Sequence, residues 1–294
     1  MWGDVLNSGP VFTTMRINQN GPLFLDAHIS RLRESYRTVF NKTLDTNPNR
    51  VKHLIDRLEQ PPETPFLTRI EVHRDGRIVV LPRRMTTAPS SIRLSTQPLP
   101  SRYGNGPRIK QGSWTDYSNA RRAAVSKGAD AALLIHRDLI VDGDTFTPLF
   151  YLETGELAIP DSNMGAVKSV TLNETRNLIS RKISVVQKPI KISQMNQIKD
   201  ALAFGTGVGI RRIKSIDSHQ INYQIDSPLE DLFCEIEDSG ILEGHLLTSR
   251  SKRIEYVLDI EKENPLMSIL EGIRNRDPSG CLLYTSDAAD DVLC

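Results

Sequence analysis

The stretch IKQGSWTDYSNARRAAVSKG, Ile109–Gly128, has a lysine, Lys110, at its second position, just after a segment rich in proline and glycine. Within it, Tyr117, Ala120 and Ala124 are spaced i, i+3 and i+7, which places them on one face of a helix. The glycine at the end of the stretch is the residue type that most often terminates a helix. The stretch therefore predicts a helix entered from a loop, with Lys110 held where the loop ends.

The segment before this stretch is the best candidate for a boundary between two domains. Residues 98–108, PLPSRYGNGPR, combine proline, glycine, serine and asparagine, which favour turns. A chain of 294 residues, with 38% apolar and 25% charged residues, is long enough for two globular domains of roughly 100 to 200 residues. We predict an N-terminal α+β domain over 1–101, a linker over 102–108 and a C-terminal α/β domain with a barrel-like sheet over 109–280.

Strands and helices alternate in the predicted N-terminal domain. Alternating apolar residues and a favoured Asp-Gly turn predict two hairpins. The expected elements are strands at 11–17 and 22–26, a helix at His28–Phe40, a hairpin around Asp75–Gly76 and a strand at 91–98.

The C-terminal half shows the same mixture of elements. Thr171 is followed three residues later by Glu174, a capping-box spacing that predicts a helix beginning at Thr171. The other expected elements are strands at 131–136, 139–142, 148–154, 156–160, 183–190, 210–216 and 220–225, a helix near 193–204, a glycine-rich turn at 205–209 and helical structure within 227–262.

Composition and missing motifs exclude several classes of function. The net charge is +1 and no basic block with interleaved aromatic residues occurs, so nucleic acid is not an expected partner. No apolar run approaches the roughly 18 residues that a membrane helix needs, so we expect a cytoplasmic protein without a membrane partner. The sequence also lacks the motifs of serine hydrolases, P-loop NTPases, zinc proteases and dinucleotide-binding folds.

The last stretch of the chain, CLLYTSDAADDVLC at 281–294, does not continue the pattern before it. It resembles the translation of a sequencing-library adapter and is not expected to be native. Cys281 and Cys294 lie in this tail, which leaves Cys234 as the remaining cysteine. A single thiol forms neither a disulfide framework nor a zinc site, so we predict no metal site and expect a reducing compartment.

Several residues suggest chemistry, and each also has an ordinary structural explanation. Lys110 could form a Schiff base in a cleft, although most lysines are simply solvated. Arg31 carries a guanidinium suited to phosphate, although most helical arginines face solvent. The N-terminus of the Thr171 helix and the turn GTGVG could bind an anion through backbone N–H groups, but both features are common in proteins without ligands. Asp142 and Asp144 flank a glycine, a pattern typical first of a turn and second of a functional acid.

Taken in order, these stretches resemble the class IV, fold type IV pyridoxal-phosphate enzymes, which include branched-chain and D-amino-acid aminotransferases and aminodeoxychorismate lyase. GPVFTTMRINQNGPLFLDAHISRL is similar to the family's first strand, turn and H-x-x-R-L helix. The interval from Lys110 to Gly128 matches the family's spacing of 18 residues between the Schiff-base lysine and a glycine. MGAVKSVTLNETR resembles the L-x-G-I-T-R segment, and ALAFGTGVGIRRIKSID resembles the block F-x-T-x-T-x-x-I-x-P-V-x-x-I-D. The resemblance covers residues 9–217 and implies a small N-terminal α/β sandwich followed by a larger C-terminal α/β pseudo-barrel.

The resemblance also implies a cofactor site for pyridoxal 5′-phosphate. Lys110 would bind the cofactor covalently, and Arg31 would hold its phosphate. The backbone amides of Val170 and Thr171 and the hydroxyl of Thr206 would complete the phosphate site.

Four positions bear on the acid that faces the cofactor ring and on the phosphate segment. Asp142 falls where the family has a glutamate that bonds the pyridine nitrogen, and its side chain is one methylene shorter. The segment that follows is one residue longer than in the family, which leaves Asp144 as an alternative acid. Ser169 and Leu172 replace the glycine and arginine of G-I-T-R.

The resemblance leaves three functions open. The first is a pyridoxal-phosphate-dependent transaminase acting on an amino acid and a keto acid. The second is aminodeoxychorismate lyase, which gives 4-aminobenzoate and pyruvate and would use Lys110 in the same way. The third is a catalytically weakened member that serves as a binding module, which the departures at Asp142, Ser169 and Leu172 favour. The family further implies a homodimer.

Overall fold

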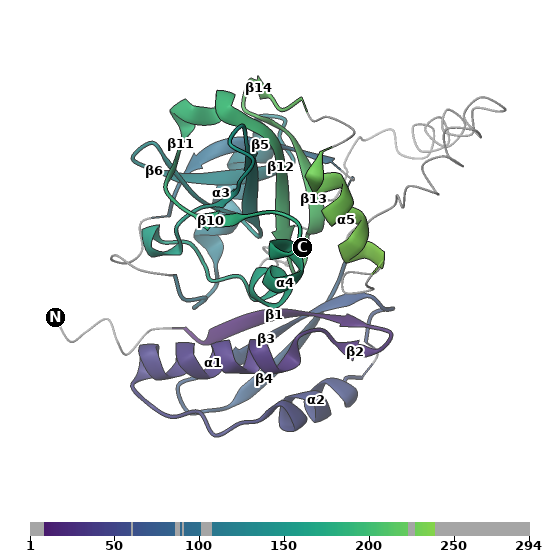
Figure 1. Ribbon diagram of the computed structural model, residues 1–294. Helices are drawn as coiled ribbons and strands as arrows, with labels where there is room; N and C mark the ends of the chain where they lie inside the picture. Colours follow the sequence, from purple (N-terminus) through teal and green to yellow (C-terminus); the bar gives the residue numbers. More distant parts are fainter. Residues whose placement is uncertain are drawn as a thin grey trace, which may run out of the picture.

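The computed structural model describes residues 9–59, 61–85, 89, 91–100, 108–222 and 227–238. Two β-sheets with helices packed around them make up this part of the chain (Figure 1). Most of the predicted linker and the whole tail at 281–294 lie outside the described residues. None of the helices in the described part is both long enough and apolar enough to cross a membrane.

The first sheet is antiparallel, with four strands in the order β2-β1-β3-β4. Its strands are β1 (Val11–Asn18), β2 (Gly21–Pro22), β3 (Phe66–Val72) and β4 (Ile78–Arg84). Helices α1 (Leu25–Phe40) and α2 (Pro48–Asp56) lie on the side of this sheet that faces away from the larger one (Figure 1). Met15 of β1, Ile29 of α1 and Ile70 of β3 are fully buried in one apolar core between α1 and the sheet. Alternate residues of each strand point to this core.

One hairpin in this region is confirmed and the other is corrected. The turn at Asp75–Gly76 joins β3 to β4 as predicted. The strand expected at 22–26 is wrong beyond its first residue, because Phe24 adopts a left-handed conformation (φ 55°) and a helix begins at Leu25. Helix α1 therefore starts about one turn before the predicted His28.

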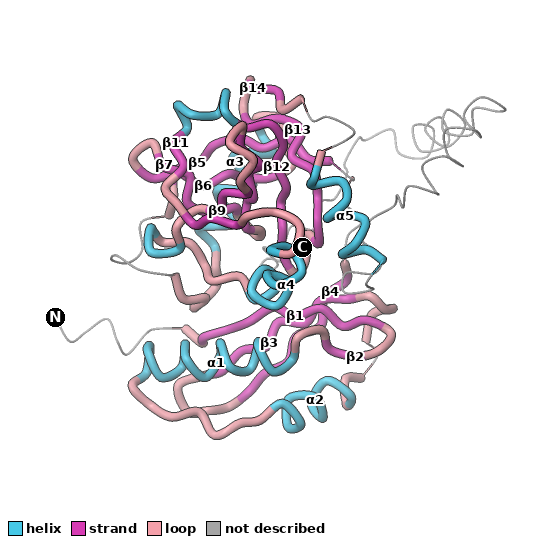
Figure 2. The backbone as a smooth tube through the Cα atoms, in the orientation of Figure 1, coloured by secondary structure: helices cyan, strands magenta, loops and turns pink. Residues whose placement is uncertain are grey.

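The second sheet is larger, mixes parallel and antiparallel pairs and curls on itself (Figure 2). Its order is β10-β9-β8-β12-β13-β5-β6-β7-β11, with β14 paired to β13. The strands are β5 (Ser91–Pro98), β6 (Ala131–His136), β7 (Leu139–Gly143), β8 (Thr147–Leu152), β9 (Leu157–Ile159), β10 (Val185–Gln187), β11 (Ile190–Lys191), β12 (Ile198–Gly205), β13 (Gly209–Ile216) and β14 (His219–Gln220). Its helices are α3 (Thr115–Ser126), η2 (Ser162–Met164), α4 (Val170–Ser180), η3 (Ile192–Gln197) and α5 (Pro228–Asp238). The α+β fold class with a barrel-like larger sheet is confirmed.

Strand β5 belongs to the larger sheet, although the prediction placed residues 91–98 in the N-terminal domain. It pairs in parallel with β13 and β6, and Ile92 and Leu94 are buried in the core of the larger sheet. The chain therefore passes from the first sheet to the second between β4 and β5, before the predicted linker. The domain limits themselves remain a prediction.

The helix predicted near 193–204 is wrong. A short 3-10 helix, η3, occupies the first half, and β12 occupies the second. Because β12 lies between β8 and β13 and is buried on both faces, its run ALAF lacks the alternation of a half-exposed strand. A short continuous apolar run fits either element by pattern alone.

Helix α5 confirms helical structure at the start of the 227–262 stretch. Leu229, Leu232 and Ile236 recur at helical spacing and are buried against the larger sheet. The remainder of the stretch, from residue 239 on, lies outside the described residues.

Candidate active site

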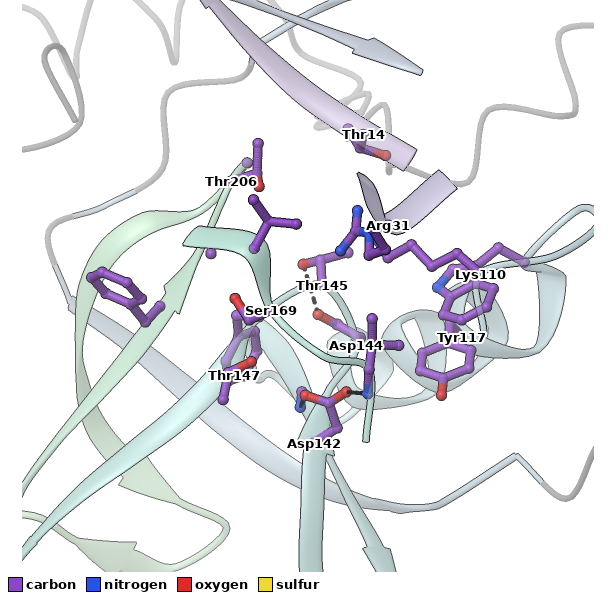
Figure 3. Close-up of a pocket in the computed structure, with 18 residues that line it drawn as sticks. Thr14, Arg31, Lys110, Tyr117, Asp142, Asp144, Thr145, Thr147, Ser169 and Thr206 are labelled. Carbon is purple, nitrogen blue, oxygen red and sulfur yellow. Dashed lines mark hydrogen bonds between the residues drawn. The ribbon is translucent and has the colours of Figure 1, made fainter. Parts of the chain in front are cut away.

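A pocket where the two sheets meet gathers five of the six predicted site residues. It encloses about 630 Å³, counting the part open to solvent. The five that line it are Arg31 of α1, Lys110 in the loop before α3, Asp142 of β7, Val170 at the start of α4 and Thr206 in the turn after β12 (Figure 3). The sixth, Thr171, does not line the pocket, but its hydroxyl lies within hydrogen-bond distance of the hydroxyl of Thr206.

Backbone pairing with β1 fixes the segment that carries Lys110. The carbonyl of Lys110 accepts a hydrogen bond from the N–H of Phe12 (2.9 Å), and the N–H of Gly112 donates to the carbonyl of Pro10 (2.9 Å). The Nζ of Lys110 lies 5.6 Å from the ring centroids of both Phe12 and Trp114. The amine of this pocket residue thus lies beside two aromatic rings that contact each other.

Two aromatic residues of this wall are absent from the sequence-based site. Trp114 stacks on Tyr117 with ring centroids 4.1 Å apart and meets Phe12 edge-on at 5.5 Å. The hydroxyl of Tyr117 is buried and has no hydrogen-bond partner among the described residues. Burial raises the pKa of Tyr117, and the negative charge of Asp142 raises it further, so the phenol keeps its proton at neutral pH. Helical periodicity placed Tyr117 only on one face of a helix with Ala120 and Ala124, and such a pattern does not separate a pocket wall from a core.

Asp142 is a buried acid in the pocket wall. Its carboxylate accepts hydrogen bonds from the N–H groups of Gly143 (3.0 Å) and Val167 (2.9 Å). Burial raises the pKa of Asp142 to about 7, although both hydrogen bonds and the positive charge of Lys110 act in the opposite direction. Asp142 can therefore change its charge near neutral pH, and a second cation beside it would keep it ionised.

Asp144, the alternative acid, is also buried and lines the same pocket. Its carboxylate accepts hydrogen bonds from the N–H of Ala132 (3.0 Å) and from the hydroxyl of the threonine that follows it (3.0 Å). Burial raises the pKa of Asp144, and the strongest opposing influence is the positive charge of Arg121 on α3. Asp142 instead interacts with the charge of Lys110, so the two acids of the pocket interact with different cations.

Arg31 brings a positive charge to another part of the pocket. Its Nη1 donates to the carbonyl of Lys168 (3.2 Å), and its Nη2 donates to the hydroxyl of Thr13. The residue is partly exposed, but its guanidinium lies inside the protein, where burial lowers its pKa to about 10. Its Nε is buried without a partner, and no ion pair of Arg31 with a carboxylate occurs among the described residues. An enclosed cation without a counter-charge is costly, so this site is suited to an anionic ligand.

The helix start beside Arg31 differs from the predicted one. Helix α4 begins at Val170, and its N-cap is Ser169, whose hydroxyl accepts a hydrogen bond from the N–H of Leu172 (3.3 Å). Thr171 is the second residue of the helix, so the capping box of Thr171 and Glu174 is wrong. The first N–H groups of a helix have no partner within it, which leaves those of Val170 and Thr171 as donors to an anion.

We expect Ser169→Ala to lower the free energy of unfolding by roughly 0.5–2 kcal/mol, because the first turn of α4 loses its side-chain acceptor. Urea unfolding of the cofactor-free protein measures this change. Ser180→Ala, at the exposed last residue of the same helix, is the matched control and should have little effect. Equal effects of the two substitutions would contradict the assignment of the cap.

The glycine-rich turn after β12 places Thr206 beside α4. A Cβ at Gly205 would lie 3.1 Å from the carbonyl oxygen of Thr145 and 3.3 Å from the Cα of Phe146, so a side chain there would crowd the neighbouring backbone. The hydroxyl of Thr206 lies 3.0 Å from that of Thr171, which ties the turn to the helix. The turn GTGVG is therefore part of the pocket as well as the entry to β13.

Comparison with known proteins decides the family. The sequence model of the amino-transferase class IV family matches residues 10–216. The chain belongs to the class IV aminotransferases. No curated protein matches its sequence.

Solved structures share the fold of this class IV aminotransferase. A fold IV-transaminase from Curtobacterium pusillum superposes with a TM-score of 0.64 at 17% identity, over 80% of this chain and 86% of the other. A protein assigned as 4-amino-4-deoxychorismate lyase from Legionella pneumophila reaches 0.65 at 17% identity, over 80% and 92%. A hypothetical aminotransferase from Mycobacterium tuberculosis, in its PLP-bound form, reaches 0.64 at 14% identity, over 80% and 89%. At these identities the likeness shows the fold alone.

Class IV aminotransferases use pyridoxal phosphate, and the pocket of this member fits that group by its own contents. The unpartnered Nε and uncompensated charge of Arg31 call for an anion such as phosphate, next to the N–H groups at the start of α4. Arg31, Val170, Thr171 and Thr206 would hold the phosphate. The amine of Lys110 would bind the cofactor covalently, and a buried acid would face the nitrogen of its ring.

Proposed function

We propose that this class IV aminotransferase is a transaminase, which moves an amino group between an amino acid and a keto acid with pyridoxal phosphate bound covalently through Lys110. The observation that carries the proposal is one pocket lined by the amine of Lys110, the buried acid Asp142 and the enclosed cation Arg31. Transamination needs a nucleophilic amine, a partner for the ring nitrogen and an anchor for phosphate, and these three groups match those needs.

Lys110 has two tasks in the proposed reaction. Its Nζ would hold the cofactor covalently until a substrate amine replaced it. As a free amine, Lys110 would act as the general base and acid that removes the proton from Cα of the substrate and returns it during transfer of the amino group. When bound, pyridoxal phosphate supplies the ring that accepts the electron pair left on Cα. The rings of Phe12 and Trp114, each 5.6 Å from Nζ, limit the access of water to this amine.

Asp142 would keep the ring nitrogen protonated. Its carboxylate is held by two backbone N–H groups and is buried, so a cation beside it favours the ionised form strongly. Lys110 supplies one such positive charge, and a protonated ring nitrogen would supply a second.

The departures from the family pattern support an enzyme over a binding module. Ser169 caps α4, and Leu172 is buried in a hydrophobic cluster of the larger sheet, so both residues position the helix start. Asp142 lines the pocket despite its shorter side chain. None of these substitutions removes a backbone donor from the phosphate site.

Spectroscopy of the holoenzyme separates the transaminase from the lyase. A transaminase mixed with an amino acid alone should change its visible absorbance once, and a keto acid should reverse the change. A lyase should instead release 4-aminobenzoate and pyruvate from aminodeoxychorismate. Protein that stays colourless with added cofactor, and in which borohydride fixes no cofactor to Lys110, would contradict both activities.

We also infer a cytoplasmic homodimer from the resemblance to the family. Sedimentation at micromolar concentration tests the oligomeric state. A monomer under those conditions would contradict this inference.

A further inference from the structure

Behind Arg31 lies a hydroxyl and imidazole pair that the proposed reaction does not use. The hydroxyl of Thr13 accepts a hydrogen bond from Nη2 of Arg31 and lies 2.7 Å from Nδ1 of His28. Thr13 and His28 are 0% and 1% exposed, so water does not compete for these bonds. His28 and Arg31 are three residues apart on α1 and therefore share a face of the helix.

Thr13 contacts the guanidinium from outside the pocket. Successive residues of a strand point to opposite faces, and it is the next residue, Thr14, that lines the pocket. Thr13 instead lies on the face of β1 that packs against α1, where it meets His28. It is thus placed to orient Arg31 and not to bind a ligand.

The donors and acceptors of the three groups define one arrangement. A guanidinium only donates, so Thr13 uses a lone pair for Arg31 and keeps its own proton for Nδ1 of His28. This requires a neutral imidazole with its proton on Nε2. Burial lowers the pKa of His28, and the positive charges of Arg31 and Lys110 lower it further, so the ring is neutral. The other neutral tautomer would leave both the hydroxyl proton and Nε2 unpaired, whereas this one leaves only Nε2 unpaired.

The pair holds Arg31 without adding a negative charge. Another enclosed arginine, Arg212, is held instead by carboxylates, with Asp200 at 3.2 Å and Glu230 at 2.9 Å. A carboxylate beside Arg31 would satisfy the guanidinium and compete with an anionic ligand. A hydroxyl and a neutral imidazole leave the positive charge uncompensated.

We propose that Thr13 and His28 are positioning residues for Arg31, which orient the guanidinium through neutral groups so that its full charge acts on the phosphate of the cofactor. This inference rests on the proposed function, since it takes Arg31 as the phosphate ligand. It assigns phosphate affinity to two residues that do not touch the ligand.

The test compares the binding of pyridoxal phosphate and of pyridoxal, which lacks the phosphate, to cofactor-free protein. Thr13→Val should weaken the binding of pyridoxal phosphate by about tenfold and leave that of pyridoxal unchanged, since only the phosphate contact depends on Arg31. Thr13→Ser keeps the hydroxyl and should restore most of the loss. Thr68→Val, at a buried threonine on the same face of the same sheet, is the matched control and should change neither affinity.

Two further variants complete the design. His28→Asn keeps an acceptor near Nδ1 and should bind pyridoxal phosphate better than His28→Leu. Unfolding of each cofactor-free variant checks that the fold is retained. If Thr13→Val weakens both ligands equally, or neither, the positioning role is overturned.

Arg31→Ala separates this inference from the function on which it rests. It should abolish the preference for pyridoxal phosphate over pyridoxal. If that preference survives in Arg31→Ala, the phosphate site of the proposed function fails. If the preference is lost in Arg31→Ala but unchanged in Thr13→Val, only the positioning role fails.

Discussion

Lys110→Ala should abolish turnover and covalent attachment of pyridoxal phosphate while leaving the protein folded. The reaction loses both its nucleophile and its proton carrier, so we expect turnover to fall by more than about 10⁴-fold. The fold should persist because the contact that fixes this segment is the carbonyl of residue 110 with the N–H of Phe12, which alanine retains. Visible absorbance, mass spectrometry after borohydride reduction and urea unfolding measure the three effects.

Two controls make the lysine result specific. Lys110→Arg keeps the positive charge but cannot form the covalent bond, so it should be as inactive as alanine. Lys127→Ala removes an exposed lysine at the end of α3 and should have no effect on turnover. Substantial turnover in Lys110→Ala, or cofactor fixed to another lysine, would refute the assigned role.

Asp142→Asn should retain the cofactor but lower the rate by on the order of 100-fold, because an amide cannot stabilise a protonated ring nitrogen as a carboxylate does. Steady-state rates on protein saturated with cofactor measure this effect. Asp144→Asn is the matched comparison, since Asp144 is equally buried but interacts with Arg121 in place of Lys110. A larger rate loss in Asp144→Asn would identify Asp144 as the acid that faces the ring.

The same variant should change how stability depends on pH in the cofactor-free protein. Burial raises the pKa of Asp142 from 3.8 to about 7, so the folded state binds more protons than the unfolded state between these values. The contribution of Asp142 is therefore complete below pH 3.8 and is lost as pH rises to about 7. Asp142→Asn should flatten the decline of the unfolding free energy across this window. An unchanged slope would show that Asp142 is already ionised at low pH.

Local sequence was sufficient for the elements whose pattern is complete within a short segment. The spacing of Tyr117, Ala120 and Ala124 predicted α3, which ends at Ser126, two residues before a glycine with φ +81°. Helix α2 was not predicted, although its signals are equally local: Asn47 caps it and a proline occupies its first turn. These features depend on residues only a few positions apart, so a single sequence contains them in full.

The order of motifs also determined the family, and with it the pocket residues Lys110, Arg31, Asp142, Val170 and Thr206. Spacing along the chain could select these residues only through the resemblance. It did not show that Asp142 and Asp144 interact with the charges of different cations, because Lys110 and Arg121 lie on a separate part of the chain from both acids.

Tertiary structure decided what depends on distant partners. β12 is a strand because β8 and β13 pair with it on both sides, and β5 joins the larger sheet because β6 and β13 flank it. The hydroxyl of Thr171 faces Thr206 while Ser169 caps the helix, and Thr13 meets Arg31 only once β1 packs on α1. Most residue types differ in secondary-structure propensity by only a few tenths of a kcal/mol. Hydrogen bonds and burial between segments contribute more free energy than that, so they decide the element. For these residues the sequence specifies the structure only through contacts that span the whole fold.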